Sequence, residues 1–416
     1  MGSLAKGLAH ERLRRLWSSS QTHEDLGRMK SGRIEPIDAA RGCAMILVCL
    51  SHVRYHFDEE SSLYFLLTTV TRIATPTFLL LSGFVAGYLL RTNLDRKTAV
   101  TLVDRGLFLL LVAHLFHGLA EVPVAGLFDW MFARASIPDA IGVALCIAPL
   151  LWRMSTRMLL ALGATLCVVS WPIAMLWVPQ HDWSIVLGRV LFNARSVHTA
   201  LIDVSVVPYL GMFLLGMGLS AHLHRALLEV DHAAIATRLS RLGAIAVAAA
   251  LAGLTAWHFG RGFLPAGIQE SADADFVRHT LDPRVKYPPS PAYLLFYGGA
   301  GLLMAATFFF GKPKAAIGPI VRHGAVIGRA SLMCFVLQDL LLFVVPLILG
   351  FHLLKFDPFW IAYVVFVIAG LYVAATLWGG IRGNRFFTIG LRALYRRQAA
   401  RSQQLPALRA GEPAAR

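Results

Sequence analysis

Charged side chains are scarce in this sequence. Only 15% of its 416 residues are Asp, Glu, Lys or Arg, whereas 56% are hydrophobic. A soluble globular domain carries about 25% charged residues. No polar stretch is long enough to form a second, soluble domain. The composition therefore excludes an ordinary soluble protein and predicts a polytopic membrane protein built as one helical bundle.

The motifs of common soluble enzymes are also missing. The sequence has no Walker-type phosphate loop, no HExxH zinc motif, no GxSxG nucleophile elbow and no dinucleotide-binding fingerprint. Each of these motifs supports a particular chemistry, so those chemistries lack support here. Acyl transfer from a thioester needs none of them, because a histidine can act as general base or carry the acyl group itself.

Neither a disulfide framework nor a metal site is indicated. His114 and His117 lie three residues apart in an apolar segment, but no carboxylate or third ligand stands near them at helical spacing. We therefore expect no bound metal or cofactor. The cysteines lie in apolar segments without C-x-x-C spacing, which predicts small buried side chains; they are Cys43, Cys49, Cys146, Cys167 and Cys334.

Apolar runs predict ten transmembrane helices. The predicted spans are 37–57, 63–90, 100–120, 138–152, 157–178, 204–221, 241–259, 290–310, 327–350 and 358–380. With both termini in the cytoplasm, Lys and Arg gather in the cytoplasmic loops and acidic residues in the others, as the positive-inside rule requires. The net charge of +15 thus reflects topology, and no nucleic acid is expected as a partner.

The ends of the chain flank this bundle. Residues 1–32 are basic and have no apolar run of signal-peptide length, so we predict a cytoplasmic N-terminal segment. Residues 33–382 form the predicted transmembrane domain, and residues 383–416 form a predicted basic cytoplasmic tail. The localisation predicted is a multi-pass plasma membrane protein of a bacterial inner membrane.

The first predicted span contains ionisable residues, which are costly in a membrane and usually mark a functional site. Asp38 and Arg41 are three residues apart and can pair on one helical face. His52 follows Arg41 by eleven residues, about three turns or about 16 Å along the axis. Arg41 and His52 therefore project from nearly the same side at different depths.

This spacing, an Arg and a His separated by ten residues, resembles the signature of the membrane-bound acyltransferase-3 superfamily. A nearer resemblance is to the branch of heparan-alpha-glucosaminide N-acetyltransferase and its bacterial relatives. Ser51 and the Gln338–Asp339 pair differ from that branch, where an acidic residue and a histidine are common. The resemblance is carried in order by the segments 33–57, 71–84, 104–112, 286–299 and 327–338.

The resemblance implies transfer of a short acyl group, expected to be acetyl, from cytoplasmic acyl-CoA to a hydroxyl or amine of a glycan-type acceptor outside. His52 would be the catalytic base or an acyl carrier, and Asp38 would orient Arg41. Arg41 and Arg105 would bind the donor, since arginine suits the phosphates of coenzyme A. Ser82 would line the channel.

A buried carboxylate in the ninth span, Asp339, requires a partner, for which Arg72 and Arg329 are candidates. We include Arg72 and Asp339 among the predicted substrate-binding residues. A structural tether between helices explains Asp339 equally well. The polar outer segments 179–203 and 260–289 could form a roof over a site or simply connect spans.

Two other functions fit ten spans with buried charges. A transporter or flippase for an anionic solute or a lipid-linked sugar is the main alternative, although no internal repeat is visible in the sequence. A signalling or scaffold membrane protein is the other, and it would leave His52 without a task.

Overall fold

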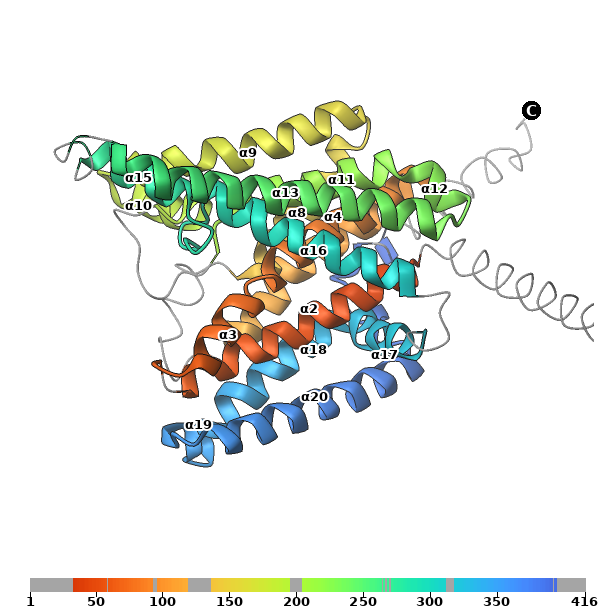
Figure 1. The fold of residues 1–416 in the computed structure, drawn as a ribbon. Helices are drawn as coiled ribbons and strands as arrows, with labels where there is room; N and C mark the ends of the chain where they lie inside the picture. The colour runs from red at the N-terminus through yellow and green to blue at the C-terminus, as the bar shows by residue number, and fades with distance from the viewer. Residues whose placement is uncertain are drawn as a thin grey trace, which may run out of the picture.

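The structure is a computed structural model that describes residues 33–57, 59–92, 96–118, 136–194, 204–263, 265, 268, 271–311, 318–391, 393 and 394. The regular elements of this part are helices, which lie roughly alongside one another as a bundle (Figure 1). The predicted all-α class is confirmed. The predicted segment 1–32 lies outside the described residues.

Within the described ranges, ten apolar helices occupy the positions of the ten predicted spans. Eight are long and apolar enough to cross a membrane, and two, Ile137–Leu151 and Val206–His222, are shorter. In chain order they are α2 (Glu35–Val53), α3 with α4 (Ser62–Thr71, Ala74–Thr92), α5 (Arg96–Phe108, helical to Gly118), α8 (Ile137–Leu151), α9 (Thr156–Leu176), α11 (Val206–His222), α13 (His232–Gly260), α16 (Pro291–Gly311), α18 (Ser331–Asp339, continuing to Ile348 through α19) and α20 (Asp357–Gly380).

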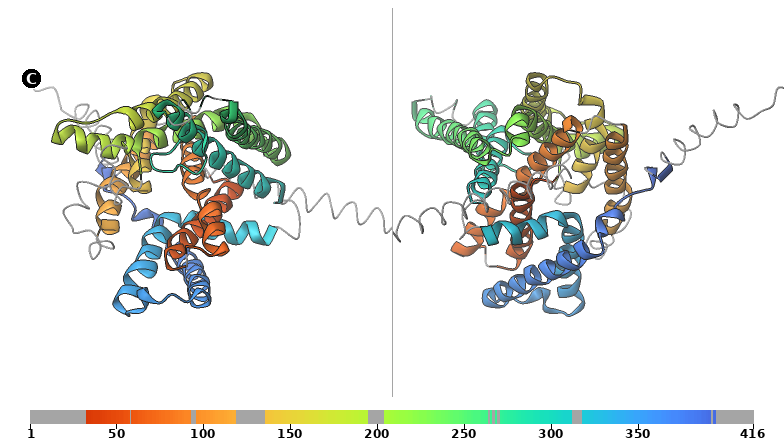
Figure 2. Two further views of the ribbon diagram at one scale, coloured as in Figure 1. Left: turned by 60° about the vertical axis from the view of Figure 1, so that its left-hand side comes forward. Right: turned by 90° about the vertical axis from the view of Figure 1, so that its right-hand side faces the viewer.

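The helices form two groups that meet at α2 and α4. On one side α13 packs on α16, and α11 packs on both α9 and α4. On the other side α17 (Gly318–Arg329), α18 and α20 pack around α2. The views in Figures 1 and 2 show α20 at the edge of this second group and α9 at the opposite edge. The first predicted span is therefore central in the bundle.

Close backbone contact joins α2 to α17, a helix that the sequence did not predict. Gly328 lies so near the carbonyl of Asp38 that a Cβ atom at Gly328 would overlap it, and Gly42 meets the backbone of Gly324 in the same way. Small residues permit such approach between membrane helices. The contact brings Arg329, the last residue of α17, to the helix that carries Asp38.

The predicted ninth span begins too early. The chain breaks at Ala330, between α17 and α18, so the apolar helix starts at Ser331 rather than at residue 327. The end of α17, which carries Arg329, therefore lies beside the first turns of α2, which carry Asp38 and Arg41. We call this end of the bundle, predicted to face the cytoplasm, the inner end, and the other the outer end.

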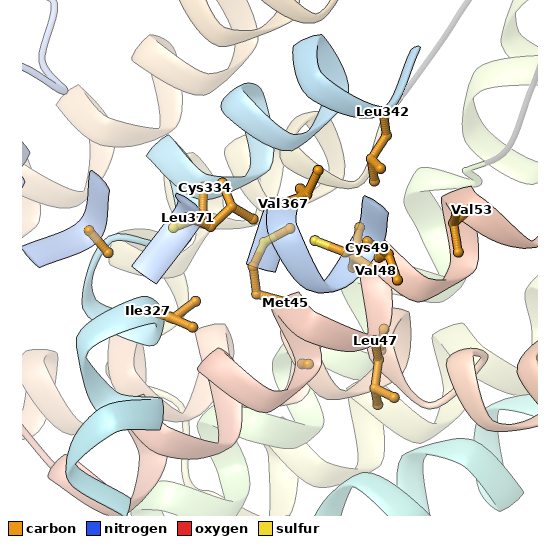
Figure 3. Packing of buried hydrophobic residues seen from close by; sticks show 14 of the residues in the cluster. Met45, Leu47, Val48, Cys49, Val53, Ile327, Cys334, Leu342, Val367 and Leu371 are labelled. Atoms are coloured by element: carbon orange, nitrogen blue, oxygen red, sulfur yellow. The ribbon is translucent and has the colours of Figure 1, made fainter. Parts of the chain in front are cut away.

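An apolar cluster supports this arrangement between α2, α18 and α20. Figure 3 shows Met45 and Cys49 of α2 in this cluster with Cys334 of α18 and with Val367 and Leu371 of α20. Each of these side chains is nearly inaccessible to solvent. As predicted, the cysteines are free; Cys49, Cys167 and Cys334 are buried, and Cys43 and Cys146 are half-buried.

Short helices fill the connections. At the outer end, α15 (Ala272–Leu281) lies within the segment 260–289, and α10 (Asp182–Leu187) with the π-helical turn Gly188–Phe192 lies within 179–203. Residues 195–203 lie outside the described residues. The remaining short elements are η1 (Arg54–His56), α12 (His224–Leu228), η5 (Arg261–Phe263), η7 (Phe351–Leu353) and η8 (Gly383–Arg385).

Candidate functional site

A cavity of about 200 Å³ lies inside the bundle, and three predicted substrate-binding residues line it. They are Arg41 of α2, Ser82 of α4 and Arg105 of α5, and Arg329 of α17 joins them. The remaining lining is mostly apolar side chains of α4, α5, α8 and α18. The structure thus brings together residues that are far apart in sequence, and it places three guanidinium groups around one apolar cavity.

Arg41 is fixed within this wall. Its guanidinium donates a hydrogen bond to the Ser331 hydroxyl at 2.7 Å, at the start of α18. Asp38 is buried on the same helix, and the charges of Arg41 and Arg329 act on it favourably. Asp38 thus lies near enough to both guanidinium groups to feel their charges, and its role in orienting Arg41 stays a prediction.

A larger cavity of about 1250 Å³ opens at the inner end and adjoins the first. The two cavities share Arg105, Arg329, Asn384 and Phe387 in their walls. Further arginines, Arg33, Arg382 and Arg385, line the larger cavity. A polar, basic vestibule thus leads into a narrower apolar cavity.

The C-terminal segment forms one wall of this vestibule, although the sequence predicted a tail from residue 383. The buried carboxylate of Asp104 in α5 accepts hydrogen bonds from the Thr388 hydroxyl and from the backbone amides of Ile389 and Leu391, the amides at 3.0 and 3.2 Å. Asn384 donates to the Arg329 carbonyl at 2.9 Å. We call residues 382–391 the strap.

A cluster of polar side chains surrounds His52 at the other end of α2. Its Nδ1 lies 3.0 Å from the Oε1 of Gln338 and 3.5 Å from a carboxylate oxygen of Asp339, both in α18. The amide nitrogen of Gln338 donates a hydrogen bond to Asp339. Gln338 and Asp339 are fully buried, whereas 23% of the His52 side chain is accessible.

Asp339 has partners other than those the sequence suggested. Neither Arg72 nor Arg329 is among its ion pairs in the described part of the chain; instead it lies between His52 and His117, whose Nδ1 is 2.6 Å from Oδ2. The predicted partners were wrong because contacts between helices, which the sequence does not reveal, determine what Asp339 pairs with. A π-helical turn at 109–113 precedes His117 in the third span.

His114 belongs to a neighbouring pair. Its Nδ1 lies 2.9 Å from Asp139 at the start of α8, and the same carboxylate accepts hydrogen bonds from the amide and hydroxyl of Ser136. His114 and His117 thus each pair with a different carboxylate. Among the described residues no group of three metal-ligating side chains occurs.

The apolar cavity ends next to the histidine cluster. Phe335 of α18 lines the cavity, and its ring centroid lies 5.4 Å from that of His117. Gln338 and Asp339 follow Phe335 within about one helical turn. A second π-helical turn, Leu340–Val344, follows Asp339 directly, and such turns are frequent at functional sites.

The hydrogen bonds define the chemistry available to His52. Because the Gln338 amide nitrogen faces Asp339, its oxygen faces His52 and can only accept. Nδ1 of a neutral His52 must therefore carry the proton, and Nε2 carries the lone pair. A histidine held in one tautomer by a neighbour that is itself oriented by a carboxylate is the arrangement that general-base catalysis needs.

Two predicted site residues lie elsewhere. Asp38 and His52 are fourteen residues apart in α2, about 21 Å along its axis, so they cannot act on one reacting group. Any part that Asp38 takes in the reaction is therefore through Arg41, as the resemblance implies, and not through contact with His52. Arg72, which caps α3, lines a separate cavity at the outer end.

Comparison with known families identifies the class of protein. The profile of the acyltransferase 3 family, described as an acyltransferase domain, matches residues 34–379. The chain belongs to the acyltransferase 3 family. It is a multi-pass membrane acyltransferase, which favours the enzyme over the transporter and scaffold alternatives. No curated protein and no solved structure gives a significant match.

Proposed function

We propose that this acyltransferase moves a short acyl group, acetyl in the first instance, from cytoplasmic acyl-CoA to a hydroxyl or amine of a glycan-type acceptor at the outer end. The observation that carries the proposal is the continuous series of a basic vestibule, an arginine-lined apolar cavity and a histidine cluster along α2. The resemblance to heparan-alpha-glucosaminide N-acetyltransferase supports the choice of acetyl and of a glycan.

The donor would enter through the vestibule. Its phosphates would meet Arg33, Arg382 and Arg385, since guanidinium groups bind phosphate by charge-assisted, often bidentate hydrogen bonds. The pantetheine arm would extend past Arg41 and Arg105 into the apolar cavity. The thioester would then reach the region of Phe335, beside the histidine cluster.

His52 would act as the general base. Nε2 takes the proton of the acceptor hydroxyl or amine while the acceptor oxygen or nitrogen attacks the thioester carbonyl. The carbon–sulfur bond then breaks, and the departing thiolate takes the proton from the imidazolium. Gln338 and Asp339 keep Nδ1 protonated throughout, and the Asp339 carboxylate stabilises the positive charge that forms on His52.

Donor binding by the purified protein in detergent tests the proposal without knowledge of the acceptor. Acetyl-CoA, succinyl-CoA and free CoA are compared by thermal stabilisation, which rises with occupancy of the folded state. We expect stabilisation that Arg41→Ala and Arg105→Gln each weaken. The control is Arg241→Gln on α13, because Arg241 lines neither donor cavity. Absence of stabilisation by all three compounds would contradict the proposal.

A further inference from the structure

The carboxylate of Asp339 presents its two oxygen atoms to different helices. Oδ1 accepts a hydrogen bond from the amide nitrogen of Gln338 and lies 3.5 Å from Nδ1 of His52. Oδ2 faces the third span, where Nδ1 of His117 lies 2.6 Å from it. The reaction proposed above involves the first oxygen, so the contact made by the second oxygen has a different role.

The contact between His117 and Asp339 is shielded from water. Only 1% of the Asp339 side chain and 10% of the His117 side chain are accessible, and the facing atoms Nδ1 and Oδ2 are both buried. A buried carboxylate is costly unless its oxygens have partners. A proton must lie between Nδ1 and Oδ2, because two lone pairs at this distance would repel each other. The contact is therefore attractive, and it stabilises one orientation of the carboxylate.

The third span is shaped so that His117 reaches α18. The π-helical turn Leu109–Ala113 follows α5 and precedes His117. Such a turn inserts one extra residue into the helix, which rotates each later side chain by about 100° relative to a regular α-helix. The π-helical turn thus sets the direction in which His117 points, and this direction is toward Asp339.

His117 also borders the path proposed for the donor. Its ring centroid lies 5.4 Å from that of Phe335, which lines the apolar cavity. Phe335 and Asp339 are four residues apart in α18, so they lie on one face of that helix. His117 contacts both residues of this face and therefore lies where the apolar cavity meets the histidine cluster.

An ion pair between two helices can also serve as a tether alone, and His114 in the same span provides the comparison. Its Nδ1 contacts Oδ2 of Asp139, and the same oxygen accepts hydrogen bonds from the amide and hydroxyl of Ser136. That carboxylate caps the start of α8, which is a structural task. The carboxylate beside His117 instead uses its other oxygen to orient the amide that contacts His52.

We propose that His117 is a positioning residue of the acyltransferase. It holds Oδ2 of Asp339 so that Oδ1 faces the amide nitrogen of Gln338. Gln338 then directs its oxygen at Nδ1 of His52. This inference rests on the proposed function and adds a residue of the third span to the groups that orient the base. His117 acts through Asp339 and not on the substrates.

Two amide replacements of His117 test the position of its N–H group. In His117→Asn the amide nitrogen takes about the place of Nδ1, whereas in His117→Gln it takes about the place of Nε2. We expect His117→Asn to retain most of the turnover and His117→Gln to lose about 10-fold, less than the general base itself contributes. The KM for acetyl-CoA and the thermal stabilisation by acetyl-CoA should stay unchanged in both variants.

Turnover is measured as release of the CoA thiol from acetyl-CoA by the purified full-length protein. The acceptor is supplied as membranes of the cells that naturally produce the protein. His222→Gln is the matched control, because His222 is an exposed histidine at the end of α11 and lines none of the cavities described. It receives the same substitution, and its turnover should equal that of the wild type.

A second measurement tests whether His117 acts through Asp339. The double variant His117→Gln, Asp339→Asn should be no slower than Asp339→Asn alone, because the first substitution then removes support from a carboxylate that is already absent. Two residues in one network show such non-additive effects, whereas independent residues show additive ones. Full additivity of the two losses would overturn the proposal, since a purely structural role of His117 predicts it.

Three further outcomes would also overturn the proposal. The first is wild-type turnover in His117→Gln, and the second is a higher KM for acetyl-CoA with unchanged turnover. The third is a large loss of turnover in His117→Asn, an outcome that does not depend on whether His117→Gln folds. Stabilisation by acetyl-CoA confirms that each variant is folded.

Failure of this inference is distinguishable from failure of the proposed function. A wild-type protein that acetyl-CoA does not stabilise, or that releases no thiol, would contradict the proposed function and this inference with it. A wild-type protein that passes both assays and is matched by His117→Gln leaves the proposed function intact. In that case only the positioning role of His117 is rejected.

Discussion

Nδ1 of His52 lies 3.0 Å from Oε1 of Gln338, and Gln338 in turn donates a hydrogen bond to Asp339. An amide thus stands between the histidine and the carboxylate that orients it. The order of these three groups determines which histidine nitrogen holds the proton. Several consequences of this arrangement and of its surroundings can be measured.

Replacing Gln338 should impair catalysis without affecting donor binding. In Gln338→Leu the acceptor for the Nδ1 proton of His52 is lost, so both tautomers become accessible and the base is misoriented. We expect turnover to fall about 100-fold, within the range of general-base contributions, while acetyl-CoA stabilises the variant as it does the wild type. An unchanged rate, or a loss confined to acetyl-CoA affinity, would contradict the role of Gln338.

Removing the Asp104 carboxylate should release the strap. Asp104→Ala deprives Thr388, Ile389 and Leu391 of their common acceptor. We expect faster cleavage of the strap in limited proteolysis and weaker acetyl-CoA binding, because the strap forms one wall of the vestibule. Thr307→Ala on α16 is the control, since its hydroxyl donates to the Met304 carbonyl of its own helix and it lines neither inner cavity. Equal cleavage rates in both variants would argue against this account of the strap.

The contact between α2 and α17 should not tolerate a methyl group. In Gly328→Ala the new Cβ overlaps the Asp38 carbonyl, so the helices must separate. We expect a loss of about 1–3 kcal/mol, as for other overpacked sites. Gly370→Ala on α20 is the control, because its Cβ would meet no atom within 4 Å. Thermal unfolding in detergent checks both, and equal melting temperatures would refute the contact.

The Asp282–Arg284 pair predicts a defined pH dependence at the outer end. The folded pKa of Asp282 is lowered, so its stabilising effect is fully present above the unfolded pKa, about 3.9, and is lost as pH falls through the folded pKa. Arg284 is largely exposed, so the contribution is at most about 1 kcal/mol. Melting temperatures of wild type and Asp282→Asn should differ by a constant amount from pH 5 to pH 8. A difference that shrinks within this window would contradict the assignment.

Hydropathy predicted the helices well because apolar runs report directly on membrane spans. It missed α17, whose twelve residues include Arg322, His323 and Arg329 and do not form an apolar run of spanning length. Hydropathy also placed the end of the transmembrane domain at residue 382. The strap is basic and not apolar, so its hydrogen bonds to the buried Asp104 could not be predicted from the sequence.

The site was predictable to the extent that it lies within one helix. Arg41 and His52 share α2, and their spacing indicated two depths of one path. The partners of His52 could not be derived, since Gln338 and Asp339 reach it from α18 through contacts between helices, and His117 reaches Asp339 from the third span. His117 is an ionisable residue in a predicted span, but the sequence showed no partner at helical spacing and therefore indicated no role for it.

The most direct test of the acyltransferase account compares His52→Ala with wild type in two assays on the same preparation. Acetyl-CoA stabilisation reports on the donor path, and release of the CoA thiol in the presence of acceptor-containing membranes reports on transfer. The account predicts that His52→Ala binds acetyl-CoA normally and that thiol release falls to the background, while His222→Ala at the end of α11, an exposed histidine outside the cavities described, leaves both unchanged. Full thiol release by His52→Ala would contradict it.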